Sequence, residues 1–324
     1  MIISYLYDTH FKPEIINAHN LSLLDKAIWI DLFAPTKEEE TWVEEALAIE
    51  IPTQEEMREI EISSRLYTEN NVLFMTAVMI AQSASINPKY DSVTFALTAS
   101  QLITIRYIEP QSFKMLSNGL LKATKEYRPT DILITLLEAT VDRLADILEY
   151  IGQHLDDYSN YIFQHDYTHG TKNRPDYQRV MQNIGIKSNL TAKVRESLIN
   201  FNRLVVFFRQ SSDSQMDKES KIRLLNLLRD LGSLSDYASF ISNKINFLLD
   251  ATLGMISIEQ SAIIKIFSVA AVIFLPPTLI ASIYGMNFQF MPELSFKWGY
   301  EIAILMMLVS AWLPYKYFKH KGWL

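Results

Sequence analysis

The segment Ile263–Asn287, IIKIFSVAAVIFLPPTLIASIYGMN, decides the fold of this 324-residue chain. No charged residue occurs from Ile266 to Phe290. An apolar helix of about 20 residues crosses the ~30 Å hydrocarbon core of a bilayer, so this segment is long enough to span a membrane. A second apolar run, Ile302–Tyr315, follows a short loop and has Trp298 and Trp312 as interfacial anchors. The end of the chain therefore predicts a two-helix membrane hairpin attached to a larger body.

Charged residues around the hairpin predict its orientation. The loop 288–298 carries Glu293 and Lys297, one charge of each sign. The opposite ends carry the basic residues Lys265, Lys316, Lys319 and Lys321. Because the cytoplasmic flanks of membrane helices are enriched in Lys and Arg, we expect both termini in the cytoplasm and the loop outside.

Composition excludes several classes of function. The chain has no cysteine, so it can form neither disulfides nor thiolate metal sites. Its net charge of −7 argues against nucleic acid as a partner, because such binding needs a basic face. Residues 1–12 lack the basic start and apolar core of a signal peptide, so we expect the long N-terminal part to stay in the cytosol. The common nucleotide-binding, nucleophile-elbow and zinc-protease motifs are absent from the sequence, which predicts that the protein is not an enzyme.

The first 130 residues predict an α+β cytosolic domain, a mixed sheet with flanking helices. Short apolar runs predict strands at Ile28–Leu32, Val72–Ala81, Val93–Ala99 and Leu102–Tyr107. A helix is predicted over Lys37–Ala48, because Thr36 and Glu39 have the spacing of a capping box, in which the first and last residue bond each other's backbone.

Long helices are predicted for the rest of the body. Ile132–Tyr161 and Arg174–Phe208 have helical spacing and opposite charge, which favours antiparallel pairing. After a polar break, no proline occurs until Pro276, so we expect one helix from about Asp217 to Ile283, roughly 100 Å long at 1.5 Å per residue. Such a helix cannot bury itself alone and predicts an oligomeric stalk. The predicted segments are a domain 1–130, antiparallel helices 131–216, a stalk 217–262, a pore-lining membrane helix 263–287, a periplasmic loop 288–298, a second membrane helix 299–318 and a cytosolic tail 319–324.

Two groups in the body have the spacing of metal ligands. Asp142, Asp146 and Glu149 share one helix face, but no His or Asn completes a ligand set, so we interpret them as an acidic outer face. His165 and His169 are four residues apart, a spacing that can bind zinc. Because glycine and proline follow closely, we interpret that pair as part of a solvated loop.

A stripe of mostly small or hydroxylic residues follows one face of the predicted stalk and first membrane helix. Steps of four and three residues give Asp250, Gly254, Ser257, Ser261, Ile264, Ser268, Ala271, Leu275 and Thr278. Such a stripe is either a close helix–helix contact or a surface that lines water. It continues into the polar stalk and leads toward Asn287, which favours a pore. One such helix cannot enclose a channel, so several copies must surround an axis.

The motifs at the hairpin resemble one family. Tyr284-Gly285-Met286-Asn287 after the first membrane helix, with Met291-Pro292-Glu293-Leu294 in the loop, resembles the CorA family of magnesium channels, in its enterobacterial-like branch. The likeness continues at Ile264–Ser268, Phe274–Thr278, Tyr317–Lys319 and Trp323–Leu324. This resemblance implies a homopentamer in the lipid of the inner membrane. It implies Mg²⁺ influx, with cobalt and nickel as further ions, and no covalently bound cofactor.

Magnesium chemistry gives the motif a role. Mg²⁺ gives up its water reluctantly, so a ring of Asn287 side chains with the carbonyls of Gly285 and Met286 can select the hydrated ion. Leu275 and Ile264 would form apolar rings that close the path by dewetting. Glu293 would concentrate cations at the outer mouth. The alternatives are that Gly285 only ends a helix, that Asn287 is a turn residue and that Glu293 serves solubility.

The resemblance also implies that cytosolic Mg²⁺ regulates the channel. In the family, cytosolic Mg²⁺ bound between subunits holds the closed state, which makes Asp250 a candidate regulatory metal ligand. Ser261 stands where related proteins commonly have Asn, so a second amide ring at the cytosolic mouth is in doubt. Two other functions remain open. One is zinc transport, as in a related branch; the other is a membrane-anchored interaction protein with a coiled-coil stalk, which would need neither Asn287 nor the stripe.

Overall fold

The computed structural model describes residues 1–8, 10–59, 61–85, 88–123, 127–163, 176–212, 216–287, 289 and 291–323. His165 and His169 lie outside these ranges. The chain divides into two compact units, Met1–Leu249 and Asp250–Leu324. Each unit is described separately.

A mixed β-sheet forms the centre of the first unit. Its described strands are β1 (Ile2–Tyr7), β2 (Phe11–Ile16), β3 (Trp29–Phe33), β4 (Leu66–Glu69), β5 (Val72–Ala81), β6 (Lys89–Leu97) and β7 (Leu102–Arg106). They lie in the order β2-β1-β3-β7-β6-β5-β4. Strands β3 and β7 pair in parallel, and the other neighbours pair antiparallel. The four predicted strands correspond to β3, β5, β6 and β7.

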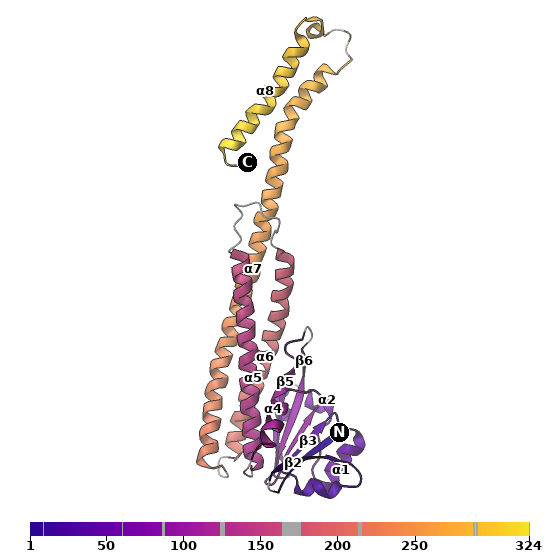
Figure 1. Ribbon diagram of the computed structural model, residues 1–324, viewed down its shortest axis with the longest axis vertical. Coiled ribbons are helices and arrows are strands. Elements are labelled where there is room, and N and C mark those ends of the chain that lie inside the picture. Colours follow the sequence, from indigo (N-terminus) through magenta and orange to yellow (C-terminus); the bar gives the residue numbers. More distant parts are fainter. Residues whose placement is uncertain are drawn as a thin grey trace. The chain divides into compact units, whose positions relative to one another are not determined.

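Short helices cover one face of this sheet (Figure 1). They are η1 (Leu21–Lys26), α1 (Lys37–Leu47) and α2 (Gln54–Met57). Helix α3 (Ile62–Arg65) contacts β4 and β5, and α4 (Gln111–Leu120) lies against α5. The predicted capping box at α1 is confirmed, since Glu39 N–H donates to Thr36 Oγ1 at 3.3 Å and Thr36 N–H donates to Glu39 Oε2 at 2.8 Å. Val43 of α1 packs with Ile30, Leu32 and Ile103 of the sheet in one buried core, which holds the helix on that face.

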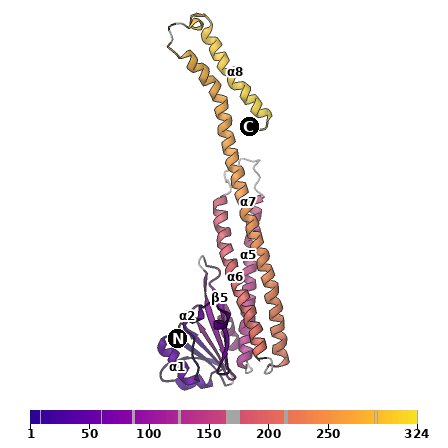
Figure 2. The same cartoon turned by 180° about the vertical axis from the view of Figure 1, so that it is seen from behind.

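Three long helices run side by side beside the sheet (Figures 1 and 2). They are α5 (Pro129–Phe163), α6 (Tyr177–Ser212) and the part of α7 (Lys218–Tyr284) that belongs to this unit. Helix α6 is tied to the sheet, because Ser197 Oγ donates to the carbonyl of Val78 in β5 at 2.7 Å. The predicted helix from Asp217 to Ile283 agrees with α7 to within a residue at each end.

Helix α5 packs against α6, as its charge pattern predicts, but its described inter-helix ion pairs are with α7. Arg223 bonds Glu138 at 2.6 Å, and Lys244 bonds Asp156 at 2.6 Å. Between these pairs, a Cβ at Gly152 of α5 would lie 2.7 Å from the hydroxyl of Tyr237 in α7. Helix α6 instead offers Lys187, whose Nζ lies 4.2 Å from the ring centre of Tyr150.

The second unit is a helical hairpin. It holds the last part of α7, the short helix η2 (Pro292–Ser295) and α8 (Gly299–His320). Helix α7 continues through Pro276 and Pro277 without ending. The predicted α+β domain followed by a very long helix is thus confirmed by the described elements.

Candidate ion pathway

Helix α8 covers one face of α7 and leaves the predicted stripe uncovered. Val269 of α7 and Ala303 of α8 are the buried apolar side chains among the described residues of this unit. The half-buried positions of α7 include Ile273, Ile280 and Tyr284, which share the face of Val269. At 100° per residue, that face lies opposite the stripe. The stripe residues Ser261, Ile264, Ser268, Ala271, Leu275 and Thr278 are all exposed. They are therefore free to contact other copies or water.

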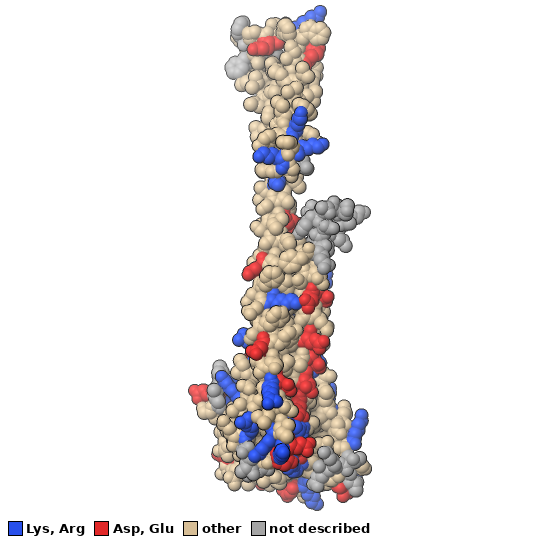
Figure 3. All heavy atoms as spheres, turned by 90° about the vertical axis from the view of Figure 1, so that its left-hand side faces the viewer, with Lys and Arg blue, Asp and Glu red and all other residues tan. Residues whose placement is uncertain are grey.

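The two ends of the hairpin meet at a basic and aromatic cluster. Lys265 Nζ lies 4.9 Å from the ring centre of Trp323, which stacks on Phe318 at 5.4 Å. Lys316 lies 4.9 Å from the ring of Trp312. Figure 3 shows basic side chains gathered below a surface of these helices that is mostly free of charge on the face drawn. The start of the apolar segment and the end of α8 therefore lie at the same end of the hairpin.

Gly285, Met286 and Asn287 come directly after the last turn of α7. Gly285 N–H closes that turn on the carbonyl of Ala281 at 2.9 Å, and Met286 N–H bonds Ile283 at 3.2 Å. A Cβ at Gly285 would lie 3.2 Å from the oxygen of Ala281, so a larger residue would press on the helix end. Asn287 is exposed. This geometry places an amide side chain beyond the end of the uncovered face.

Thr278 and the two prolines leave different oxygen atoms available as hydrogen-bond acceptors on α7. The Thr278 hydroxyl donates to the carbonyl of Phe274 at 2.8 Å, so its proton is used within the helix and its lone pairs face outward. Pro276 and Pro277 have no N–H, so the carbonyls four residues earlier, at Val272 and Ile273, receive no bond from them. Acceptor oxygens are thus the polar groups that this part of α7 can present to a hydrated cation.

The loop contains a residue that the sequence interpretation missed. A Cβ on Gly299, the first residue of α8, would lie 2.7 Å from the backbone oxygen of Glu293. Gly299 N–H bonds the carbonyl of Phe296 at 3.0 Å, which folds the loop back on η2. The sequence feature that could have identified Gly299 is its position directly after Trp298, at the start of a predicted helix. Glu293 itself is exposed.

The described acidic residues outside the hairpin do not form a metal site by themselves. In the described ranges no three His, Cys, Asp or Glu side chains are close enough to hold a metal ion together. Asp250 is exposed and forms no described ion pair. On the first unit, partial burial and then the carboxylates of Glu138, Asp146 and Asp230 raise the pKa of Asp142. Figure 3 shows acidic side chains in a row along the long helices of this unit.

Length and composition identify α7 as the described helix that can cross a membrane. Helix α8 falls short of the same criterion within the described part of the chain; its ends carry Glu301, Lys316 and Lys319. Its role as a second membrane helix stays a prediction. An apolar helix with an uncovered stripe of mostly small or hydroxylic residues, ending in an exposed amide, is the arrangement expected of a membrane protein with an ion path.

Comparison with known proteins gives the family. Residues 25–320 match the family described as CorA-like Mg²⁺ transporter protein, and the chain belongs to that family. The magnesium transport protein CorA of Mannheimia succiniciproducens is 33% identical over 310 residues, covering 95% of this chain and 96% of its own. That of Pasteurella multocida is 34% identical over 302 residues, covering 93% of each. The solved CorA magnesium transporter of Methanocaldococcus jannaschii has the same fold, with a TM-score of 0.76, 18% identity and coverage of 100% and 99%.

Proposed function

We propose that copies of this chain surround an axis in the inner membrane and form a homopentameric channel for Mg²⁺ influx. One observation carries the proposal: in a chain of the CorA-like family, the stripe of α7 that α8 leaves uncovered leads to Asn287. The names of the curated relatives favour magnesium over zinc. Cobalt and nickel are further ions, because their hydrated forms are similar in size. Transport, rather than an enzymatic reaction, is the activity.

The filter is a ring of Asn287 amides. Their oxygens accept hydrogen bonds from the water shell of Mg²⁺, which the ion keeps because it dehydrates reluctantly. Backbone carbonyls of Gly285 and Met286 add acceptors at the same end. Below them, the pore is lined by Thr278, Leu275, Ala271, Ser268, Ile264 and Ser261. Leu275 and Ile264 are its apolar constrictions, which shut by dewetting.

Residues outside the pore govern the entry of cations and the regulation of the channel. Glu293 lies at the outer mouth and attracts cations, and both termini face the cytoplasm. Exposed apolar residues such as Phe267 and Phe274 contact lipid or neighbouring copies. Asp250 holds regulatory Mg²⁺ with ligands from an adjacent copy. The segments 263–287 and 299–318 are the membrane helices, and 217–262 is the stalk.

Uptake into liposomes tests this function directly. Purified full-length protein in vesicles that contain a magnesium indicator should admit Mg²⁺, and Co²⁺ should compete more strongly than Zn²⁺. A membrane-anchored interaction protein would carry no ion. Absence of Mg²⁺ uptake by well-assembled protein at low internal Mg²⁺ would reject the proposal, and uptake of Zn²⁺ alone would assign the zinc branch.

Asn287→Ala tests the filter. We expect transport to be lost while the oligomer stays intact in size-exclusion chromatography, because the amide supplies the ring of acceptors. Gln289→Ala is the matched control, since Gln289 is a nearby exposed amide outside the motif. Normal uptake by the Asn287→Ala protein would remove the filter from the proposal.

A further inference from the structure

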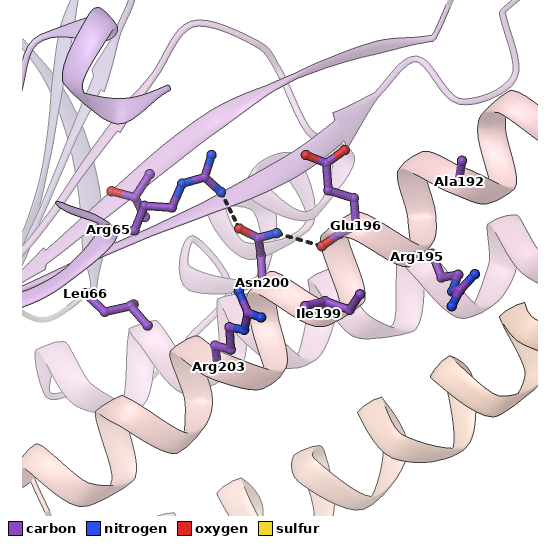
Figure 4. A pocket seen from close by; sticks show the side chains of 9 residues that line it. Arg65, Leu66, Ala192, Arg195, Glu196, Ile199, Asn200 and Arg203 are labelled. Atoms are coloured by element: carbon purple, nitrogen blue, oxygen red, sulfur yellow. Dashed lines mark hydrogen bonds between the residues drawn. The ribbon is translucent and has the colours of Figure 1, made fainter. Parts of the chain in front are cut away.

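A cavity of about 480 Å³ lies between α6 and the junction of α3 with β4, on the first unit (Figure 4). Arg65 and Leu66 line it from that junction. Arg195, Ile199 and Arg203 line it from α6, each four residues after the last, so they share one helix face. No part of the ion pathway enters this cavity.

The cavity has an excess of positive charge. Guanidinium groups stay protonated, so Arg65, Arg195 and Arg203 each contribute a full charge. None of these arginines has a described carboxylate within 4.0 Å. Glu196, the acidic residue of the lining, bonds Lys193 at 3.1 Å. The lining therefore has three arginines against the single carboxylate of Glu196, an excess of positive charge.

Arg65 is held in place before any ligand arrives. Its Nη1 donates to Asn200 Oδ1 at 2.6 Å, and Asn200 Nδ2 donates to the carbonyl of Glu196 at 2.7 Å. Figure 4 shows the guanidinium groups of Arg65 and Arg203 on either side of the Asn200 side chain. Partial burial lowers the pKa of Arg65, the carboxylate of Glu196 partly offsets this, and the like charge of Arg203 adds a smaller lowering. A bound anion would relieve that repulsion.

We propose that this cavity binds a nucleoside di- or triphosphate, with the phosphates on the guanidinium groups and the nucleoside against Ile199 and Leu66. The planar fork of Arg matches phosphate oxygens, and several cations suit more than one phosphate. The volume lies in the range of small-molecule sites, about 300–1,000 Å³, and exceeds what inorganic phosphate fills. Ile199 is 43% exposed beside these charges, which gives the nucleoside an apolar surface. This site is independent of magnesium transport.

Equilibrium dialysis of the full-length protein in detergent tests the site. Radiolabelled ATP is the probe, and EDTA is present so that magnesium chelation has no effect on the result. We expect saturable binding that inorganic triphosphate displaces more weakly than unlabelled ATP does and that adenosine does not displace. Absence of binding at low salt, or displacement by adenosine but not by triphosphate, would overturn the proposal.

Substitutions locate the binding. Arg195→Ala and Arg203→Ala should each weaken ATP binding by about tenfold or more, because each removes a charge-assisted contact. Alanine is tolerated at exposed helical positions, so both variants should keep the parent's thermal midpoint. Arg179→Ala, an exposed arginine on the same helix outside the cavity, should bind as the parent does. Equal weakening by Arg179→Ala, or none by the other two, would show that ATP does not bind in this cavity. Magnesium uptake plays no part in these measurements.

Discussion

At the scale of single residues, Arg106 shows how the sheet holds a charge in its interior. It bonds Asp31 at 2.8 Å, and these two side chains are only 8% and 2% exposed. The guanidinium carbon lies 4.6 Å from the ring centres of both Phe33 and Phe113. Thr104 Oγ1 donates to the same carboxylate at 2.8 Å, so the acid is fully engaged. The pair spans the parallel strands β3 and β7.

Arg106→Ala should therefore destabilise the protein strongly. Removing one partner leaves Asp31 buried without its cation, which costs roughly 3–5 kcal/mol. Urea denaturation of the full-length protein in detergent measures the change. Arg58→Ala is the matched control, because it breaks an ion pair with Asp91 in which the arginine is 57% exposed, and such pairs contribute about 0–1 kcal/mol. Equal losses from both variants would contradict this account.

At the scale of the elements, the acidic face of α5 has a pH-dependent effect on stability. Because the pKa of Asp142 is raised, the folded protein binds its proton more tightly than the unfolded chain does. Stability from this group therefore falls as pH rises from near 4, the unfolded value, through the raised folded value. At neutral pH the ionised group opposes folding.

Asp142→Asn should thus raise the thermal midpoint at pH 7 and have no such effect below about pH 4. The gain should stay under about 1 kcal/mol and shrink in high salt, because exposed charges are screened. Asp157→Asn is the control and should give no gain in the thermal midpoint. Asp157 is an exposed carboxylate of the same helix, and its ion pair in the described ranges is with His154. A midpoint that falls at pH 7 in Asp142→Asn would show that the repulsion is not the controlling interaction.

Elements with a local signal could be predicted from sequence, and those with long-range causes could not. The capping box at Thr36 and the absence of proline before Pro276 located α1 and α7 closely. Strand β2 was missed, because Pro13 and charged residues hide an edge strand in which proline is tolerated. The parallel pairing of β3 with β7 joins segments far apart in sequence, which no local pattern specifies. Likewise, the positively charged cavity at Arg65 needs α6 and β4 brought together by the fold.

At the scale of the whole molecule, the orientation in the membrane is open to a direct test. Ser295→Cys introduces a single thiol into a chain without cysteine, in the loop between the two hairpin helices. A membrane-impermeant maleimide should label this thiol in intact cells. The positive charges that flank the hairpin favour the cytoplasm for both termini, which leaves the loop outside. Lys319→Cys is the control and should react only after lysis. The reverse labelling pattern would invert the topology.

Gating is the second prediction at this scale. In the proposed oligomer, Asp250 carboxylates would repel one another until Mg²⁺ bridged them. Asp250→Lys should keep the stalk resistant to protease without Mg²⁺, because the ammonium group can reach acceptors on a neighbouring copy. Asp250→Asn should lose the protection at all Mg²⁺ concentrations. If both variants keep the parent's magnesium-dependent protection, Asp250 is not part of the regulatory site.

The uncovered face of α7 has a genetic consequence. In the proposed oligomer, a residue there would be repeated in every copy around the axis, so one defective chain would alter the pathway of each assembly it joins. Co-expression of Asn287→Ala with the parent should therefore suppress uptake out of proportion to its share of the chains. Arg106→Ala acts before assembly, since chains that fail to fold never join, and should be recessive. Whether a substitution alters the pathway or prevents folding thus decides whether its allele is dominant.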